Sequence, residues 1–593
     1  MKRISLKITG AQGQGVNSVG EMCAKGLKRA GYCVFGYREY MSLIKGGHSS
    51  YQLDVSNDKV ESTEQLVDIL VCFNHHGLEK NVQEVKPGGV VLHQTPDWQW
   101  SAQQLKDLRK RRITVLELPT DSIVTKLKAK PIIANVLITS VVWSLLGQKE
   151  EALKALVQEQ FGHKKDLLEL NYRCVEEGFA FRATHMAVAS VMLPAADKKR
   201  WKDALLVTGS HAMGLGLVHA GVRFYAGYPM TPSSPLLTFI AEIQNETGMI
   251  IKQAEDEITA AQIVSGAMHM GTRAVTATSG GGFDLMTETV SMNGIIENPS
   301  VIILAQRPGP GTGLPTWTAQ GDLFLAIFGG HGEFARCVMS VADAQDSFDL
   351  MPEAFNLAEE FQTPVIVLTD KQIAEALWTQ QPWNQKKAKL RRGKLVTEAR
   401  QLAKLKSADR YDPTVKDGVS SRWLPGSKAA TYVAQADEHS ADGSVDETDE
   451  NARLQMEKRM RKQVALRKQL PEPELFVGGK AAWLTPSLDL LLVGWGSSKS
   501  VVLDALSSPD LKGKRVGYLH YSYLWPLKTE LFGKLAKKSK RVAVVEGNNM
   551  AQLAQLIRME CGIRIDASIL KYDGRPFFYD ELKQEILNLL PKI

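Results

Sequence analysis

The chain has 593 residues, of which 44% are hydrophobic and 23% are charged, and its formal net charge is +7. This length is too great for a single hydrophobic core, so we expect several domains of a globular protein. No apolar run reaches the roughly 18 to 20 residues that cross a membrane, and nothing in the sequence demands the focused basic patch of a nucleic-acid-binding protein.

The six cysteines are scattered and form no Cys-x-x-Cys pair. This pattern is typical of reduced cytosolic thiols and argues against a zinc or iron–sulfur site within the chain. The first residues, MKRISLKITGAQGQG, do not resemble a signal peptide, because the apolar stretch is short and runs directly into a glycine turn. We therefore expect a cytoplasmic protein that binds no metal through its own side chains.

The first predicted unit covers residues 1–195 and begins with a strand at Ile4–Ile8, a glycine-rich segment at Gly10–Val16 and a helix that ends near Ala30. Glycines between a strand and a helix can accept a phosphate at the helix N-terminus. The spacing is not the full dinucleotide-binding fingerprint, so a tight structural turn is the preferred interpretation. Further apolar runs predict a parallel sheet covered by an amphipathic helix (69–73, 90–93, 113–118; helix 132–146).

A segment of this unit, Tyr37–Ser49, places Lys45 and His48 on either side of the glycine pair Gly46–Gly47. A glycine pair allows the backbone to come close to a ligand. Two interpretations stay open at this point, a ligand-binding loop and a solvated loop.

The second predicted unit, 196–372, alternates strand-like with helical segments, which predicts a mostly parallel sheet. Three unusual motifs each follow an apolar run: GYPMTPSS at 227–234, QAEDE at 253–257 and QRPGPGTGLPT at 306–316. Ligands of open α/β sheets bind at the carboxyl ends of the strands. We therefore expect one pocket that is lined by hydroxyl groups, a carboxylate and an arginine.

The remainder of the chain divides into a polar connection, 373–480, and a further α/β domain, 481–593. The connection contains a charged helical segment, 453–468, and the triplet Asp437-Glu438-His439, which fits a solvated turn better than a metal site. Buried strands are predicted in the last unit at 488–493, 515–520 and 541–546. The predicted fold class is therefore α/β with several domains.

The motifs of the second unit resemble those of the alpha subunits of the thiamine-diphosphate-dependent 2-oxoacid:ferredoxin oxidoreductases, and most nearly the 2-oxoglutarate synthases. The similarity rests on Tyr228–Ser234, on the Glu-Asp-Glu at 255–257 and on the Thr-Ala-Thr-Ser-Gly-Gly-Gly turn at 276–282. This chain departs from the family pattern at Pro235, where an acidic residue is frequent, and at 209–212, which reads Gly-Ser-His-Ala rather than Gly-Asn-Glu-Ala.

The resemblance implies a domain order for the whole chain. Residues 1–195 would be a Rossmann-like gamma domain, 196–372 a transketolase-like domain that binds the thiamine diphosphate pyrimidine, and 481–593 a transketolase C-terminal-like domain. It also implies that the segment containing Lys45 and His48 lies over the substrate pocket.

The resemblance assigns the catalytic carboxylate to Glu257. A carboxylate that binds N1′ of the pyrimidine promotes the imino tautomer that deprotonates C2, and Tyr228, Pro229 and Thr231 would contact the same cofactor. The competing interpretation is that 255–257 is an acidic cluster that stabilises a helix N-terminus.

The substrate-binding residues implied by the resemblance are Arg307, Thr231 and Thr316, with Lys45 and His48 as partners of a second carboxylate. Arginine suits a 2-oxo carboxylate because its guanidinium group is planar and bidentate. The alternatives are a surface ion pair for Arg307 and turn-capping hydroxyls for the two threonines.

The sequence lacks the Gly-Asp-Gly…Asn motif that holds the metal and diphosphate in these enzymes, and its cysteines could not ligate an iron–sulfur cluster. We therefore expect a beta subunit that carries Mg²⁺, the diphosphate site and a [4Fe–4S] cluster, in an alpha2beta2 complex that uses coenzyme A and ferredoxin. The implied reaction converts 2-oxoglutarate and coenzyme A to succinyl-CoA and CO2, and its reverse fixes CO2. The alternatives are pyruvate or another 2-oxoacid as substrate, and a non-catalytic nucleotide-binding assembly subunit based on the first glycine loop.

Overall fold

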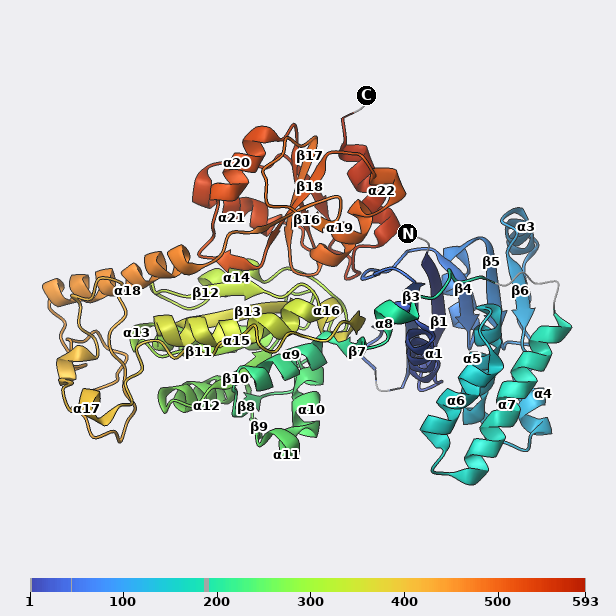
Figure 1. Cartoon of the computed structure of the whole chain (residues 1–593), viewed down its shortest axis with the longest axis horizontal. Coiled ribbons are helices and arrows are strands. Elements are labelled where there is room, and N and C mark those ends of the chain that lie inside the picture. The colour runs from blue at the N-terminus through green and yellow to red at the C-terminus, as the bar shows by residue number, and fades with distance from the viewer. Residues whose placement is uncertain (1–2, 44, 186–190, 592–593) are drawn as a thin grey trace.

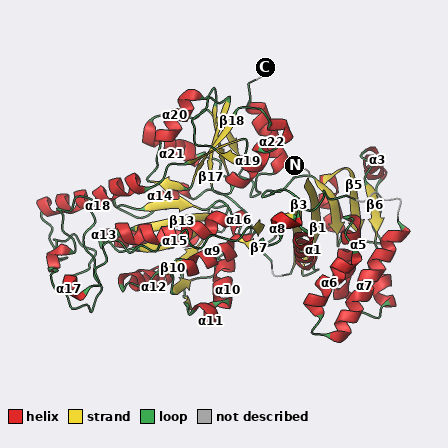
Figure 2. Ribbon diagram, viewed as in Figure 1, coloured by secondary structure: helices red, strands yellow, loops and turns green. Residues whose placement is uncertain are grey.

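The computed structural model describes residues 3–43, 45–185 and 191–591, and their strands form three β-sheets with helices packed against them (Figures 1 and 2). The N-terminal sheet lies at the right of Figure 1, the middle sheet fills the centre and the C-terminal sheet lies at the top. This arrangement confirms a multi-domain α/β fold. No helix among the described residues is both long and apolar enough to cross a membrane.

The first sheet has eight strands in the order β6-β5-β4-β1-β3-β2-β14-β7. Its predicted part is parallel and consists of β1 (Arg3–Gln12), β4 (Val67–Cys72), β5 (Val85–His93) and β6 (Thr114–Glu117). Helix α1 (Val16–Ala30) follows the glycine loop, and α5 (Ala134–Leu145) is the predicted covering helix. The other helices of this part are α2 (His75–Asn81), α3 (Ala102–Lys110), α4 (Thr120–Lys126), α6 (Glu150–Phe161), α7 (Lys165–Thr184) and α8 (Lys198–Trp201).

Two strands of this sheet are absent from the sequence prediction, β2 (Cys33–Tyr40) and β3 (Gly46–Ser56), which pair antiparallel with each other. The segment that carries Lys45 and His48 is therefore largely strand: Tyr37–Tyr40 belongs to β2, and β3 begins at Gly46, directly after Lys45. The sequence does not show the usual apolar pattern of a strand at β3, because the buried face of this strand carries polar groups. Asp54 is one of these, and it lies 3.3 Å from the guanidinium group of Arg3.

Two short strands from beyond residue 195, β7 (Leu205–Thr208) and β14 (Leu377–Gln380), complete the first sheet beside β2. The first and second parts of the chain are thus joined by strand pairing. The proposed division of the chain at residues 195, 372 and 480 stays a prediction.

The middle sheet has seven strands in the order β19-β12-β13-β11-β10-β8-β9, all parallel except β19. The bounds are β8 (Phe224–Gly227), β9 (Ile250–Gln253), β10 (Ala274–Thr278), β11 (Ser300–Gln306), β12 (Cys337–Ser340), β13 (Pro364–Asp370) and β19 (Tyr523–Trp525). The helices are α9 (Gly209–His219), α10 (Ser234–Glu242), α11 (Gln244–Thr247), α12 (Glu257–His269), α13 (Gly280–Ile295), α14 (Leu323–Phe328), α15 (Ala344–Phe361) and α16 (Lys371–Glu375). Because neighbouring strands are parallel, the three predicted motifs emerge at one edge of the sheet.

The polar connection contains α17 (Ala399–Leu402) and the predicted charged helix, α18 (Asp449–Gln469). This helix packs against the middle part, where Lys458 and Lys462 both pair with the buried Glu297. The solvated turn expected at 437–439 is wrong for His439, which is fully buried with its ring 4.2 Å from that of Tyr411. Within the described ranges, no group of His, Cys, Asp and Glu side chains is arranged to hold a metal.

The third sheet has the order β16-β15-β18-β17-β20-β21. Its strands are β15 (Glu474–Val477), β16 (Lys480–Ala481), β17 (Leu490–Trp495), β18 (Val516–Tyr521), β20 (Val542–Glu546) and β21 (Ala567–Leu570). Helices α19 (Ser498–Leu506), α20 (Glu530–Lys538), α21 (Gln552–Cys561) and α22 (Tyr579–Leu589) cover it. The Gln320 side chain, on the loop after β11, donates to the carbonyl of Trp495 at 2.8 Å and so ties this part to the candidate site.

Candidate active site

The candidate active site lies at the carboxyl ends of four adjacent strands of the middle sheet. Tyr228 follows β8, Glu257 follows β9, Ser279 follows β10 and Arg307 follows β11. The sequence alone predicted three of these strand ends, and the parallel pairing places all four at the same edge. Tyr228 and Pro229 are exposed there, and the Tyr228 side chain retains 39% of its accessible surface.

The acidic segment separates into three different environments. Asp256 is the N-cap of α12, and its Oδ1 accepts a hydrogen bond from the Thr259 amide at 2.7 Å. Glu255 is exposed. Glu257 is only 4% exposed, and its Oε1 has no hydrogen-bond partner among the residues that the structure describes. A buried polar atom without a partner costs folding free energy. This oxygen is therefore the best candidate in the segment for a contact with a bound ligand.

The turn after β10 brings glycine backbone against Glu257. A Cβ atom at Gly282 would lie 2.7 Å from Glu257 Oε1 and 2.0 Å from the hydroxyl oxygen of Thr278, so no larger residue fits without displacing them. Ser279, the N-cap of α13, is fully buried, and its hydroxyl oxygen has no partner within the described part of the chain. The first turn of α13 and the Glu257 carboxylate thus form one polar cradle.

Arg307 contacts the hydroxyl-rich turn after β8. It is 9% exposed, and its Nη1 donates to the backbone carbonyl of Thr231 at 2.7 Å. Burial lowers the pKa of the guanidinium group from its ordinary value, and the negative charge of Asp322 opposes this shift. The structure therefore brings Arg307 and Thr231 together through the Thr231 backbone, and the substrate-binding role of both residues stays a prediction.

Thr316 meets the N-terminal part of the chain. It is 3% exposed and donates its hydroxyl to the Tyr40 carbonyl at 2.5 Å. The Tyr40 phenol in turn donates to Glu375 Oε1 at 2.9 Å. Tyr40 also lines a cavity of about 360 Å³ together with Thr231, Pro235 and other residues of α9, α10 and α16 (His211, Ser234, Thr238, Phe239, Glu242, Glu375).

Lys45 and His48 occupy different surroundings. Lys45 is exposed at the start of β3, near the hairpin turn that Tyr40 anchors to Thr316. His48 is half-buried, with its ring 5.5 Å from the ring of His76. Burial, together with Lys80, Lys7 and His76, lowers the pKa of His48 to about 4, and Glu39 acts in the opposite direction. His48 is therefore uncharged at neutral pH.

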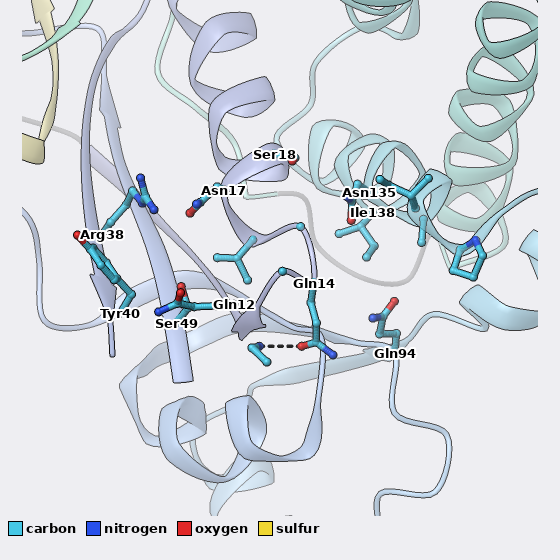
Figure 3. Close-up of a pocket in the computed structure, with 17 residues that line it drawn as sticks. Gln12, Gln14, Asn17, Ser18, Arg38, Tyr40, Ser49, Gln94, Asn135 and Ile138 are labelled. Carbon is cyan, nitrogen blue, oxygen red and sulfur yellow. Dashed lines mark hydrogen bonds between the residues drawn. The ribbon is translucent and has the colours of Figure 1, made fainter. Parts of the chain in front are cut away.

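The first glycine loop forms the predicted tight turn and also lines a cavity of about 550 Å³ (Figure 3). Gly13 and Gly15 have φ angles of 92° and 98°, and a Cβ at Gly15 would lie 2.2 Å from the Asn135 side chain. In Figure 3, Arg38 and Tyr40 lie on one side of the cavity and Gln94 on the other. Tyr40 therefore lines both cavities.

One residue of the site, Asp322, was missed by the sequence analysis. Its carboxyl group lies against Gly280, since a Cβ there would be 2.9 Å from Oδ2, and its backbone N–H donates to Gln306 Oε1 at 3.0 Å. An aspartate directly before the apolar run of α14 reads in sequence as an ordinary helix start, so no local signal singled it out.

Comparison with known proteins agrees with this geometry. Residues 215–457 match the family model of the pyruvate flavodoxin/ferredoxin oxidoreductase thiamine-diphosphate-binding domain, and residues 5–181 match that of the pyruvate ferredoxin/flavodoxin oxidoreductases. The alpha subunit of a 2-oxoacid:ferredoxin oxidoreductase from a Sulfolobus species is 33% identical over 99% of this chain and 97% of its own length. The chain belongs to this family of alpha subunits.

Two further relatives extend the comparison. The KorA subunit of a 2-oxoglutarate oxidoreductase from Mycobacterium tuberculosis is 25% identical over 98% of this chain and 91% of its own length. The solved 2-oxoglutarate:ferredoxin oxidoreductase from Magnetococcus marinus, with 2-oxoglutarate, coenzyme A and succinyl-CoA bound, superposes with a TM-score of 0.90 at 28% identity over the whole of both chains. The predicted family and its Rossmann-like and transketolase-like fold class are thereby confirmed.

Proposed function

We propose that this chain is the alpha subunit of a 2-oxoglutarate:ferredoxin oxidoreductase, which converts 2-oxoglutarate and coenzyme A to succinyl-CoA and CO2 and reduces ferredoxin. The observation that carries the proposal is the unpartnered, buried carboxylate oxygen of Glu257 at the strand ends that Arg307 and Thr231 share. The same complex could run in reverse and fix CO2. We further propose that it acts in the cytoplasm.

The residues present fit the pyrimidine end of thiamine diphosphate. When bound, this cofactor would supply a nucleophilic C2 atom and an electron sink for the decarboxylation of a 2-oxoacid. Glu257 would hold N1′ of the pyrimidine with its free Oε1, and the glycines at the start of α13 leave room for the ring. Tyr228, Pro229 and Thr231 lie at the same edge and would border the cofactor.

Arg307 would bind the carboxylate next to the 2-oxo group. Its hydrogen bond to the Thr231 carbonyl holds the side chain in place and leaves other guanidinium N–H groups for a bidentate contact. Thr231 would donate its hydroxyl beside this pair. The hydroxyl of Thr316 is engaged with Tyr40, so in this conformation its role would be to hold the β2–β3 hairpin at the pocket.

A partner subunit would complete the site. Exposed apolar side chains follow the same strand ends in sequence: Tyr228 (39% exposed) after β8, Ile258 (45%) next to Glu257 and Leu285 (50%) in α13. The sheet also ends at β9, an edge strand whose Ile250 is 65% exposed. Such a surface suits a beta subunit that supplies Mg²⁺, the diphosphate site and a [4Fe–4S] cluster in an alpha2beta2 complex that delivers electrons to ferredoxin.

Coenzyme A would use the glycine-loop cavity. The start of α1 has no side-chain cap, so backbone N–H groups there are available to a phosphate, and Arg38 provides a positive charge at the wall. Tyr40 stands between this cavity and the one beside Thr231, so a ligand anchored at the glycine loop could extend its thiol arm toward the cradle.

The experiment that tests the proposal is co-expression with the neighbouring gene for a beta subunit, followed by assay of 2-oxoglutarate-dependent viologen reduction with coenzyme A and detection of succinyl-CoA. Formation of acetyl-CoA from pyruvate instead would move the assignment to the other substrate class. Failure of the complex to bind thiamine diphosphate would favour a non-catalytic assembly role.

The choice of a dicarboxylate substrate predicts a selective effect at Lys45. Replacing Lys45 by isoleucine removes the cation from the hairpin beside Tyr40. We expect this change to weaken the binding of 2-oxoglutarate by about 1 to 3 kcal/mol, the scale of a lost hydrogen bond to a charged group. The kcat/KM for the monocarboxylate 2-oxobutyrate should not change, because 2-oxobutyrate has no second carboxylate.

The measurement is kcat/KM for both substrates in wild type and Lys45→Ile. His48→Gln serves as the matched control, because the pKa of His48 near 4 leaves it neutral at the assay pH and its replacement removes no charge. Equal losses on the two substrates would mean that the hairpin only shapes the pocket.

A further inference from the structure

Asp322 occupies an unusual position beside the proposed substrate site. The loop that leaves β11 at Arg307 returns at Asp322, where the Asp322 backbone N–H meets the Gln306 side chain at 3.0 Å. This hydrogen bond holds Asp322 beside Gln306, the residue before Arg307. On its other side, the carboxyl oxygens face the first turn of α13, since a Cβ at Gly280 would lie 2.9 Å from Oδ2 and 3.2 Å from Oδ1.

The carboxyl group of Asp322 has a buried oxygen without a protein partner. Its Oδ2 accepts no hydrogen bond within the described part of the chain, and no Lys or Arg nitrogen described there forms an ion pair with Asp322 within 4.0 Å. Arg307 acts on it by charge without direct contact, while the Arg307 guanidinium binds the Thr231 carbonyl instead. Asp322 and Arg307 thus interact through their charges without forming an ion pair.

We propose that Asp322 is a positioning residue that controls, through Arg307, how strongly the site attracts the carboxylate of the 2-oxoacid. This inference rests on the proposed function of Arg307 as the carboxylate clamp. An ionised Asp322 partly neutralises the positive charge of Arg307 and so weakens its attraction for the substrate carboxylate. A neutral Asp322 does not weaken this attraction.

The charged groups around Asp322 give the direction of the effect. Burial and the negative charge of Asp284 on α13 together raise the pKa of its carboxyl group to about 6, against the opposing positive charge of Arg307 after β11. Glu257, the other acid of the cradle, lies across the glycine turn against Gly282. A substrate carboxylate on Arg307 adds a negative charge nearby and raises the pKa of Asp322 again. By linkage, the substrate binds more tightly when Asp322 is protonated, so affinity falls as the pH rises through about 6.

The test is the pH dependence of the KM for 2-oxoglutarate, from pH 5.5 to 8, in the assembled enzyme and in Asp322→Asn. Asparagine keeps the shape of the side chain and cannot ionise. In wild type we expect KM to rise by about tenfold across this range, which corresponds to a one-unit change in pKa on substrate binding. In Asp322→Asn, KM should stay near the wild-type low-pH value throughout. Because both proteins use the same substrate, ionisation of the substrate itself cannot produce the difference.

Asp284→Asn provides a second, independent variant. Asp284 is exposed on α13, so its replacement leaves the core intact, and it removes a charge that raises the pKa of Asp322. The rise in KM should therefore move to lower pH without disappearing. Thermal unfolding of each variant reports whether the fold is kept.

Three outcomes would overturn the inference: an unchanged pH step in Asp322→Asn, a KM raised equally at every pH, or an unmoved step in Asp284→Asn. The second outcome would mean that Asp322 acts as a fixed anchor of the loop. Absence of turnover with any 2-oxoacid in the wild-type complex would instead overturn the proposed function, and this inference with it.

Discussion

Replacing Glu257 by glutamine in the assembled enzyme should slow exchange of the C2 proton of bound thiamine diphosphate by about 10² to 10⁴-fold, the usual contribution of general acid–base assistance. Glutamine retains the size of the side chain but cannot stabilise the proton at N1′ as a carboxylate does. The cofactor should remain bound, because the first turn of α13 and its glycines are unchanged. The measurement is hydrogen–deuterium exchange at C2, followed by NMR after acid quench.

Glu255→Gln is the matched control for this change. Glu255 lies two residues away in the same acidic segment, but it is exposed, whereas Glu257 is buried with a free oxygen. Its replacement should leave the exchange rate near that of wild type. Normal exchange in Glu257→Gln together with slow exchange in Glu255→Gln would show that the catalytic carboxylate has been assigned to the wrong residue.

Replacing Arg307 by lysine should raise the KM for every 2-oxoacid by roughly 10 to 150-fold. This range corresponds to the loss of about 1.5 to 3 kcal/mol for one hydrogen bond to a charged group. Lysine retains the charge but lacks the planar pair of donors that a carboxylate binds. Because all 2-oxoacids share the carboxylate that Arg307 would hold, 2-oxoglutarate, pyruvate and 2-oxobutyrate should be affected alike.

Arg223→Lys controls for a general effect of arginine replacement in this part of the chain. Arg223 is exposed directly before β8, at the end of the sheet opposite the candidate site, and it should leave KM unchanged. An unaltered KM in Arg307→Lys would mean that Arg307 has only a structural role, through its contact with Thr231.

The sequence predicted the site most successfully where chemistry and topology agree. Buried strands followed by GYPMTPSS, QAEDE and QRPGPGTGLPT had to place their motifs at one edge of a parallel sheet, and they do. The sequence could not separate the roles of three adjacent acids. That separation depends on where α12 begins, which decides which acid is its N-cap, and on which carboxylate the distant glycine turn buries, which is a tertiary contact.

The failures of the sequence analysis have a common physical origin in buried polar groups. The strand β3 was missed, and its first residues were taken as a loop, because Asp54 and its neighbours are polar, although the sheet buries them and Arg3 pairs with Asp54. His439 was placed in a solvated turn, although it packs against Tyr411. Asp322 has no local signal, because its significance comes from a loop that returns to Arg307 across 14 intervening residues. In each case the partner lies far away in sequence.

The central claim is that this chain holds only the pyrimidine side of a thiamine diphosphate site that a beta subunit completes. The most direct test is to measure cofactor retention and 2-oxoglutarate-dependent viologen reduction for the chain purified alone and for the chain mixed with that subunit. We predict weak cofactor binding and no turnover for the chain alone, and both stable binding and turnover for the complex. Turnover by the isolated chain at the rate of the complex would contradict the claim.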